Sequence, residues 1–267
     1  MRTIINALML GKWRIHRVFD REDSVDISEK DGVRSLHLGS STVQSSMRLS
    51  DPVELVLSYT RAMMGFLLFV PEPANAAMIG LGGGSLPKFI RHHFPTVRVT
   101  VVENNAAVIT AARTHFEVPD DDARFAVVLG QGERWVAEQE HTCDVLMVDG
   151  YNGRQQAGEL ATEDFYQHAL RALSPDGVLV VNLWSSDRDF DVYVQRIERV
   201  FDSVVTIPAK RLGNMAVLAF ARRPRELRWS KLKVRAHQLE TRYGLEFVTM
   251  LDGIREINPK SDKELRI

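Results

Sequence analysis

A glycine-rich turn and two acidic residues are the parts of this sequence whose residue types and spacing could do chemistry. The turn at residues 80–84, GLGGG, lies between an apolar run and a helix-length segment. Glycine allows positive φ and lets a ligand approach the bare backbone. Glu103 ends the next apolar run, roughly 20 residues further on, where a carboxylate can accept both hydroxyls of a ribose. We therefore predict that Gly80, Gly82, Gly84 and Glu103 bind an adenosyl-type nucleoside.

The spacing within the turn indicates which kind of nucleoside. The pattern is G-x-G-G-G with Ser85 next, and not G-x-G-x-x-G. Without the third glycine, a single nucleoside is favoured over the pyrophosphate of a dinucleotide. A purely structural turn is the alternative, but the flanking strand and helix and the distance to Glu103 favour binding.

Asp149 is the second acidic candidate, because it follows the apolar run 144–148 and precedes Gly150. The structural alternative is a turn or helix cap, a role that Asp readily takes before Gly. Gly130 and Gln131 follow another apolar run in the same way. Ligands of open parallel sheets bind outside the carboxyl ends of the strands, so we predict that these residues and Glu103 face one pocket.

The elements that must position these residues alternate strand and helix from residue 77 onward. This alternation predicts an α/β fold with a doubly wound, mostly parallel, seven-stranded sheet covered on both faces. Expected strands are 77–79, 97–102, 125–129, 144–148, 177–183, 204–207 and 215–221, and expected helices are 86–93, 106–115, 132–138, 162–173 and 188–200. The last two strands have no helix between them and are expected to form an antiparallel hairpin at the sheet edge.

The two ends of the chain have different patterns. Alternating apolar and polar residues at 13–19, 25–28, 33–38 and 43–47 predict a small antiparallel sheet, and a helix over 52–69 is expected to link it to the main sheet. After residue 221 the composition becomes basic and polar, with an amphipathic surface helix expected at 227–243. We predict three parts: an N-terminal β domain (1–60), a nucleoside-binding catalytic domain (61–225) and a helical C-terminal extension (226–267).

Composition excludes several function classes. The net charge of −1 gives no overall attraction to nucleic acid or to an anionic membrane. The single cysteine, Cys143, excludes an intrachain disulfide framework and is expected to be buried packing. We expect no metal site. The apolar run at residues 4–10 is too short to span a membrane, and we expect a cytoplasmic protein.

Taken in order, the motifs resemble the spermidine synthase (polyamine aminopropyltransferase) family, whose catalytic domain shares the fold of class I methyltransferases. The order is the glycine turn, V-E at Glu103, L-G-x-G at 129–132, V-D at Asp149 and the segment LATEDFY. LHLGSSTVQSSMRL resembles the family's strand–glutamine segment, with Gln44 at the position of the glutamine. The resemblance covers roughly residues 25 to 221. It implies that Asp149 is the proton acceptor and that Gln44 and Gln131 bind the nucleoside.

Residues beside these motifs are candidates for binding the acceptor. Tyr151 and Asn152 follow Asp149 at the expected mouth of the pocket, and Tyr59 belongs to a Tyr-x-Glu pattern in the family. Trp184 ends the fifth strand and is interpreted as packing, with a place in the acceptor pocket as the alternative.

The sequence departs from the family pattern at four positions where the family has an acid: Gly83, Gln131, Asn152 and Arg61. Gln131 can still accept a hydrogen bond from the adenine amine through its amide oxygen. The other changes remove or reverse contacts for a cationic chain, each typically worth ~1.5–3 kcal/mol. The sequence therefore indicates a divergent member of the family.

Three functions follow. The first is aminopropyl transfer from decarboxylated S-adenosylmethionine to an amine, with Asp149 as base. The second is methyl transfer from intact S-adenosylmethionine to an unknown small acceptor, with Arg61 pairing with the donor carboxylate. The third is nucleoside binding without catalysis. In each the nucleoside is a co-substrate or ligand and no cofactor is tightly bound, and the family resemblance implies a homodimer.

Overall fold

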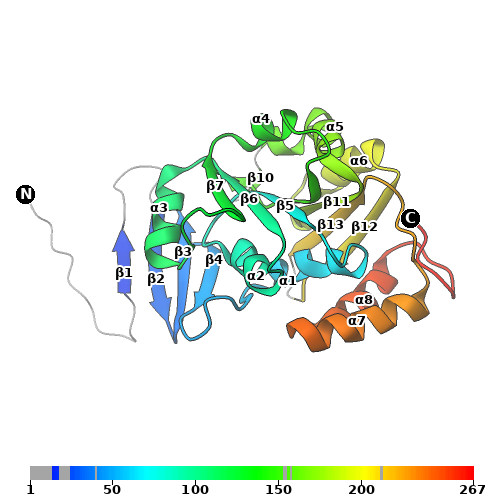
Figure 1. Ribbon diagram of the computed structural model, residues 1–267, viewed down its shortest axis with the longest axis horizontal. Helices are drawn as coiled ribbons and strands as arrows, with labels where there is room; N and C mark the ends of the chain where they lie inside the picture. Colours follow the sequence, from blue (N-terminus) through cyan, green and yellow to red (C-terminus); the bar gives the residue numbers. More distant parts are fainter. Residues whose placement is uncertain (1–13, 18–24, 40, 153–154, 157, 211–212) are drawn as a thin grey trace, which may run out of the picture.

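The computed structural model of the 267-residue chain describes residues 14–17, 25–39, 41–152, 155–156, 158–210 and 213–267 (Figure 1). Within these ranges the chain forms a small N-terminal sheet, a large central sheet with helices on both faces, and a pair of C-terminal helices.

The central sheet has seven strands in the order β12-β13-β11-β8-β5-β6-β7. Strands β5, β6, β7, β8 and β11 are parallel, and β13 runs antiparallel to both β11 and β12. Their bounds are β5 Asn75–Ile79, β6 Arg98–Glu103, β7 Phe125–Leu129, β8 Cys143–Val148, β11 Leu173–Trp184, β12 Ser203–Pro208 and β13 Asn214–Phe220. The predicted seven-stranded, mostly parallel sheet and its antiparallel edge hairpin are confirmed.

Successive residues of the central strands are buried on opposite faces of the sheet. In β8, Val145 and Met147 belong to one hydrophobic cluster, whereas Leu146 and Val148 belong to the other. Because both faces are buried, these strands are continuous apolar runs. One face is covered by α4 (Gly132–Ala137), α5 (Glu163–Ala172) and α6 (Phe190–Val200), and the other by α1 (Ser58–Met63), the 3-10 helix η1 (Met64–Leu68), α2 (Ser85–His93), α3 (Ala106–His115), α7 (Trp229–Tyr243) and α8 (Phe247–Ile257).

The N-terminal sheet has four antiparallel strands, β1 Arg14–Arg17, β2 Val25–Lys30, β3 Val33–Leu38 and β4 Val43–Arg48. Their order follows the chain, as the alternating pattern predicts. β4 lies against the glycine turn: the Ser45 and Ser85 hydroxyls are 3.3 Å apart, and Ser85 donates to the Ser46 carbonyl at 3.3 Å. The small sheet thus forms one wall beside the start of α2.

The linking helix predicted over 52–69 is shorter than expected. Helix α1 begins only at Ser58, and η1 continues to Leu68. Residues 53–57 are extended or turn-like, and the ion pair between Arg48 and Glu54 joins them to β4. Because this segment is not helical, its carbonyl groups are available to other donors.

The C-terminal segment is more closely integrated than a surface extension. The predicted helix 227–243 corresponds to α7, and α8 after it was not predicted. Both helices bury apolar residues in the cluster on one face of the central sheet, including Leu232, Phe247 and Ile254. The three-part division at residues 60 and 225 stays a prediction.

Two short strands, β9 Tyr151–Asn152 and β10 Gln155–Gln156, follow β8, and the 3-10 helix η2 (Gly158–Ala161) leads into α5. No helix in the described ranges combines the length and apolar character needed to cross a bilayer.

Candidate active site

The glycine turn and Asp149 meet at the point where the strand order reverses. From β5 the chain proceeds to β6 and β7 and then returns to β8, which pairs with β5 on its other side. The Asp149 N–H donates to the Ile79 carbonyl at 2.9 Å. Gly80 has φ +96°, and a Cβ there would lie 2.4 Å from the Asp149 carbonyl oxygen. Only glycine lets the turn pass this close to the backbone of β8.

Glu103 is held at the end of β6 by backbone donors. Its Oε2 accepts the Leu81 N–H and its Oε1 accepts the Asn105 N–H, each at 2.9 Å. The residue is 8% exposed, and burial raises the pKa of its carboxyl group while these backbone hydrogen bonds lower it. A carboxylate has about four acceptor sites, so acceptor capacity remains for a diol.

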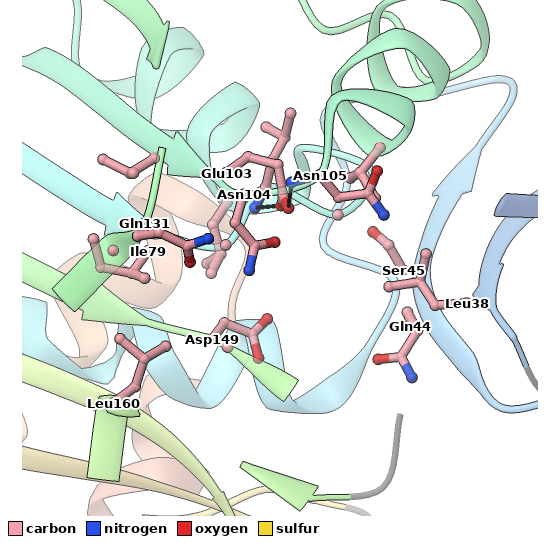
Figure 2. A pocket seen from close by; sticks show the side chains of 18 of the residues that line it. Leu38, Gln44, Ser45, Ile79, Glu103, Asn104, Asn105, Gln131, Asp149 and Leu160 are labelled. Atoms are coloured by element: carbon pink, nitrogen blue, oxygen red, sulfur yellow. Dashed lines mark hydrogen bonds between the residues drawn. The ribbon is translucent and has the colours of Figure 1, made fainter. Parts of the chain in front are cut away.

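A cavity of about 1130 Å³ opens in front of these groups. Glu103 and Asp149 extend into it from the sheet, and Gln44 and Ser45 of β4 face them from the other side (Figure 2). The lining includes the following predicted site residues: Gln44, Tyr59, Gly80, Gly82, Glu103, Gln131 and Asp149. The fold therefore brings together, at one cavity, predicted residues that are far apart in the sequence.

Two predicted nucleoside-binding glycines do not line this cavity. Gly84 precedes α2 with left-handed backbone geometry, and its missing Cβ leaves room for Val118. Gly130 is not among the lining residues, and its N–H donates to the Glu103 carbonyl at 3.0 Å. Both residues shape the wall without forming its surface.

A second cavity, of about 220 Å³, is also lined by Asp149. Gln44, Tyr59 and Asp149 line both cavities, and the smaller one is completed mainly by residues from β4, α1, β11 and β13. Asp149 is the one acidic side chain that the two linings share among the described residues. A group bound in the smaller cavity would meet a ligand of the larger one beside this carboxylate.

A chain of amide side chains holds Asp149. The Asn182 Nδ2 donates to Asp149 Oδ1 at 2.8 Å, and the Asn214 Nδ2 donates to Asn182 Oδ1 at 3.0 Å. The surrounding protein desolvates the carboxyl group and raises its pKa, whereas hydrogen bonds from Asn182 and Tyr59 act in the opposite direction. A raised pKa makes the carboxylate a stronger base than a solvated aspartate.

Other candidates differ from expectation. Arg61 lines the smaller cavity rather than the larger, and its Nε donates to Glu246 at 3.1 Å. Trp184, interpreted as packing, also lines the smaller cavity. The side chains of Tyr151 and Asn152 lie outside the described part of the structure, so their role stays a prediction.

Asn182 and Asn214 are site residues that the sequence did not reveal. They belong to no motif of the sequence and lie in apolar strands, and the antiparallel pairing of β11 with β13 brings them together. Cys143 is buried, as expected. Among the described residues, no three His, Cys, Asp or Glu side chains gather as a metal site would require.

The sequence and the fold are similar to those of known proteins. The spermine/spermidine synthase domain model matches residues 56–218. The chain is 42% identical to a polyamine aminopropyltransferase of Chromobacterium violaceum, over 95% of this chain and 98% of the relative. It is 44% identical to one of Neisseria meningitidis serogroup A, over 91% and 93%. A solved spermidine synthase in complex with the transition-state analogue AdoDATO has the same fold, with a TM-score of 0.71 at 20% identity, covering 89% of this chain and 85% of that one. The chain therefore belongs to the spermine/spermidine synthase family.

Proposed function

We propose that this protein is an aminopropyltransferase that moves the aminopropyl group of decarboxylated S-adenosylmethionine to a small amine, with Asp149 as the base. The observation that carries the proposal is the position of Asp149, the acidic residue common to the linings of the two cavities. Two relatives aligned over more than nine-tenths of this chain bear the name polyamine aminopropyltransferase, which supports this reaction.

The larger cavity has the groups that a nucleoside donor requires. Glu103 would accept the ribose hydroxyls, and the bare backbone of the glycine turn allows the donor to approach closely. Gln131 lines the same cavity, and its amide oxygen would accept from the adenine amine. These roles are proposals that rest on residue chemistry and on the shared lining.

The smaller cavity would hold the acceptor so that its nitrogen lies beside Asp149. The acceptor ammonium transfers a proton to the Asp149 carboxylate, and the freed lone pair attacks the carbon next to the sulfonium. A nitrogen–carbon bond forms as the carbon–sulfur bond breaks, and its electron pair leaves with sulfur as methylthioadenosine. The positive charge moves from sulfur to the new secondary ammonium, and Asp149 returns its proton to solvent. Positioning and proton removal are the contributions that the protein makes.

The two alternative functions have less support. Methyl transfer depended on a cation placed for the carboxylate of intact S-adenosylmethionine, but Arg61 is engaged by Glu246 and by the carbonyl groups of Leu55 and Val56. The names of the relatives also favour aminopropyl transfer. Nucleoside binding without catalysis does not explain why a second cavity adjoins Asp149 or why the pKa of Asp149 is raised.

Further expectations belong to this proposal. Assembly as a homodimer, a cytoplasmic location and the absence of a tightly bound cofactor are implied by the family resemblance or by composition. Light scattering during size-exclusion chromatography would test the dimer.

The variant Asp149→Asn tests the proposal directly. We expect kcat to fall by about 10²–10⁴-fold because the proton acceptor is lost, whereas the Kd of methylthioadenosine stays unchanged. Turnover is followed by mass detection of the aminopropylated amine, and binding by calorimetry.

Asp191→Asn is the matched control, because Asp191 is exposed on α6 and lines neither cavity. Undiminished turnover in Asp149→Asn would refute the assignment of the base. Absence of any aminopropylated product with the unaltered protein would refute the function itself.

A further inference from the structure

Three neighbouring strands each supply one polar side chain to a line that ends at Asp149. The parallel register of β8 with β11 ends one position before Asp149, so Asn182 is level with this carboxylate on the next strand. Asn214 on β13 lies opposite Trp184, two positions along from Asn182, and therefore on the same face of the sheet. Both asparagines line the smaller cavity, and Asn182 is only 2% exposed.

The chemistry of Asp149 fixes the direction of both hydrogen bonds in this line. A carboxylate only accepts hydrogen bonds, so the group that Asn182 turns toward Asp149 Oδ1, at 2.8 Å, must be its NH2. The carbonyl oxygen of Asn182 is then directed at Asn214, whose NH2 donates to it at 3.0 Å. The orientation of the Asn182 amide is therefore set from both sides, by Asp149 on β8 and by Asn214 on β13.

This orientation matters because Asp149 is enclosed by protein. Burial disfavours the charged form of its carboxyl group and raises its pKa, and the hydrogen bond from Asn182 opposes that effect. If the Asn182 amide turned over, its carbonyl oxygen would face a carboxylate oxygen, and the protonated form of Asp149 would be favoured. A protonated Asp149 cannot take a proton from an amine.

We propose that Asn214 is a positioning residue for the reaction: it orients the Asn182 amide, and Asn182 keeps Asp149 in the charged form that accepts the proton. This inference rests on the proposed function and adds two residues to the machinery of the same site. Because Asn182 engages Oδ1 of Asp149, Oδ2 is the oxygen that receives the proton.

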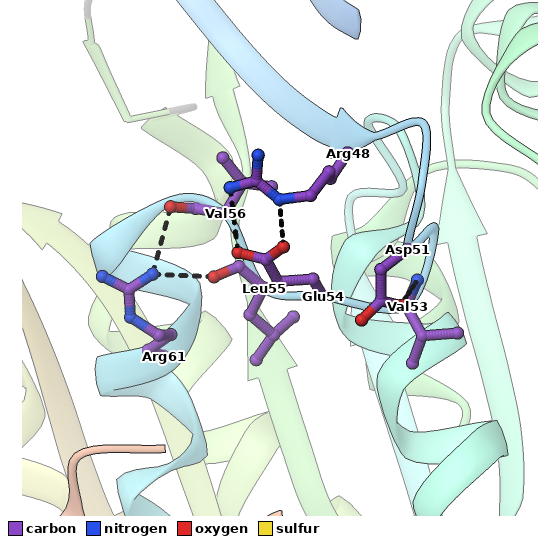
Figure 3. Close-up of polar contacts among 7 residues, drawn as sticks. All are labelled: Arg48, Asp51, Val53, Glu54, Leu55, Val56 and Arg61. Atoms are coloured by element: carbon purple, nitrogen blue, oxygen red, sulfur yellow. Dashed lines mark hydrogen bonds and ion pairs between the residues drawn. The ribbon is translucent and has the colours of Figure 1, made fainter. Parts of the chain in front are cut away.

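Other titratable groups also surround Asp149. Among the described residues, those that line the two cavities are Tyr59, Arg61, Glu103, Glu133, Arg134 and Glu159. A hydrogen bond from Tyr59 lowers the pKa of Asp149, as that from Asn182 does. Arg61 donates to the carbonyl groups of Leu55 and Val56 (Figure 3). All six side chains are kept in the variants below, so a difference between variants is not due to their replacement.

The variant Asn214→Asp reverses the line without altering Asn182 or Asp149. The new carboxylate accepts from the Asn182 NH2, which turns the Asn182 carbonyl oxygen toward Asp149. Release of methylthioadenosine from decarboxylated S-adenosylmethionine, with 1,4-diaminobutane as acceptor, is measured as a function of pH. The acidic limb of kcat/KM reports the base of the free enzyme. We expect its midpoint to rise by about one pH unit or more, the shift that corresponds to losing a hydrogen bond to a charged group.

The new charge at position 214 also acts on Asp149 directly, and a double-mutant cycle separates the two effects. In the Asn182→Leu background, Asn214→Asp should move the midpoint much less, because the amide that transmits the change is gone. An equal shift in both backgrounds would overturn the positioning role. If Asn182→Leu fails to fold, Asn214→Leu, which carries no charge, should still raise the midpoint, and an unchanged midpoint there would equally overturn the role.

Asn258→Asp is the matched control, because Asn258 is a buried amide that bonds to β12 and lines neither cavity. It should lower the free energy of unfolding without moving the midpoint, whereas an equal shift there would reduce the effect at position 214 to general loss of structure and overturn the inference. A midpoint that is the same in every variant overturns the inference and leaves aminopropyl transfer standing. No release of methylthioadenosine by the unaltered protein overturns the proposed function, and the inference with it.

Discussion

Asp149 shows how one residue is placed for chemistry at some cost to the fold. Desolvation raises the pKa of its carboxyl group above the unfolded value. Between these two pKa values the folded state binds more protons than the unfolded state, so this group's contribution to stability falls as pH rises through that window. Above it the folded protein keeps a desolvated carboxylate, which the amides of Asn182 and Asn214 support. Such a carboxylate is suited to accept a proton.

Glu103 leads to a prediction about binding of the nucleoside donor. In Glu103→Gln the amide nitrogen would face a backbone N–H of Leu81 or Asn105, and the charge-assisted bonds to the ribose would be lost. Hydrogen bonds to charged groups are worth about 1.5–3 kcal/mol, so we expect the Kd of methylthioadenosine to rise by about 10–100-fold. Calorimetry measures this change. Glu138→Gln, an exposed residue away from both cavities, should bind normally, and an unaltered Kd in Glu103→Gln would contradict the ribose assignment.

Four of the residues that were predicted from sequence lie at the carboxyl end of an apolar strand or within two residues of it. Gly80, Glu103, Gln131 and Asp149 could be grouped because parallel strands bring their carboxyl ends together. Asn182 and Asn214 could not, since their meeting depends on the register between β11 and β13, which the sequence pattern does not specify. Trp184 lines the smaller cavity, in agreement with the alternative interpretation rather than with packing alone.

At the scale of elements, the glycine turn is packed between the N-terminal sheet and the end of α3. A Cβ at Gly83 would lie 2.8 Å from both Phe116 Cδ1 and Ser45 Oγ. Phe116 is fully buried, so it has little room to move. The surrounding side chains therefore leave no room for a side chain at position 83. From the sequence alone we could see that the acid of the family is missing there, but not that its space is filled.

This packing predicts the outcome of restoring an acid to the turn. We expect Gly83→Asp to lower the free energy of unfolding by about 1–3 kcal/mol, because overpacking a filled site forces neighbours to shift, and to weaken methylthioadenosine binding. Urea unfolding and calorimetry measure the two effects. Gly158→Asp is the control, since a Cβ there meets nothing within 4 Å. A Gly83→Asp variant as stable as the unaltered protein would show that Phe116 and Ser45 yield easily.

Lys88 joins three elements and leads to a prediction about pH. Its Nζ donates to the Phe116 carbonyl at 2.6 Å and contacts Met47 Sδ at 3.1 Å, which ties α2 to β4 and to the end of α3. Burial lowers its pKa from 10.5 to about 8. Between these values the unfolded state binds more protons, so the contribution of Lys88 to stability increases as pH rises through this window.

In the unaltered protein we therefore expect Lys88 to increase the free energy of unfolding by about 2 kcal/mol between about pH 7.5 and 9.5. The variant Lys88→Met should lack this increase. Urea unfolding of both proteins at the two pH values gives the difference, in which other titrating groups cancel. Lys233→Met, on the exposed side of α7, should keep the full increase. An identical pH dependence in Lys88→Met and the unaltered protein would mean that Lys88 titrates normally.

At the scale of the whole molecule, the C-terminal helices complete one face of the sheet and its edge. The Asn258 side chain accepts the Thr206 N–H and donates to the Thr206 carbonyl, both at 2.8 Å, so it occupies backbone groups of the edge strand β12. Pairing of this kind protects an exposed edge from another chain. The sequence pattern predicted the amphipathic helix that corresponds to α7, but it did not indicate α8 or the contact of Asn258 with β12, which joins residues 52 positions apart.

We expect this C-terminal pair to unfold together with the central sheet rather than before it. The pair shares one hydrophobic cluster with the sheet strands, and Arg61 on α1 pairs with Glu246 beside α8. Unfolding of the helix pair would therefore also remove a contact of Arg61, which lines the smaller cavity. A variant with Trp229 as its single tryptophan reports on α7 during urea unfolding, whereas circular dichroism reports on all helices. The two transitions should coincide, as in a two-state protein, and a variant retaining only Trp135 in α4 should give the same midpoint. An earlier fluorescence transition for Trp229 would instead identify residues 226–267 as a separate extension, with Arg61 held less firmly once it opens.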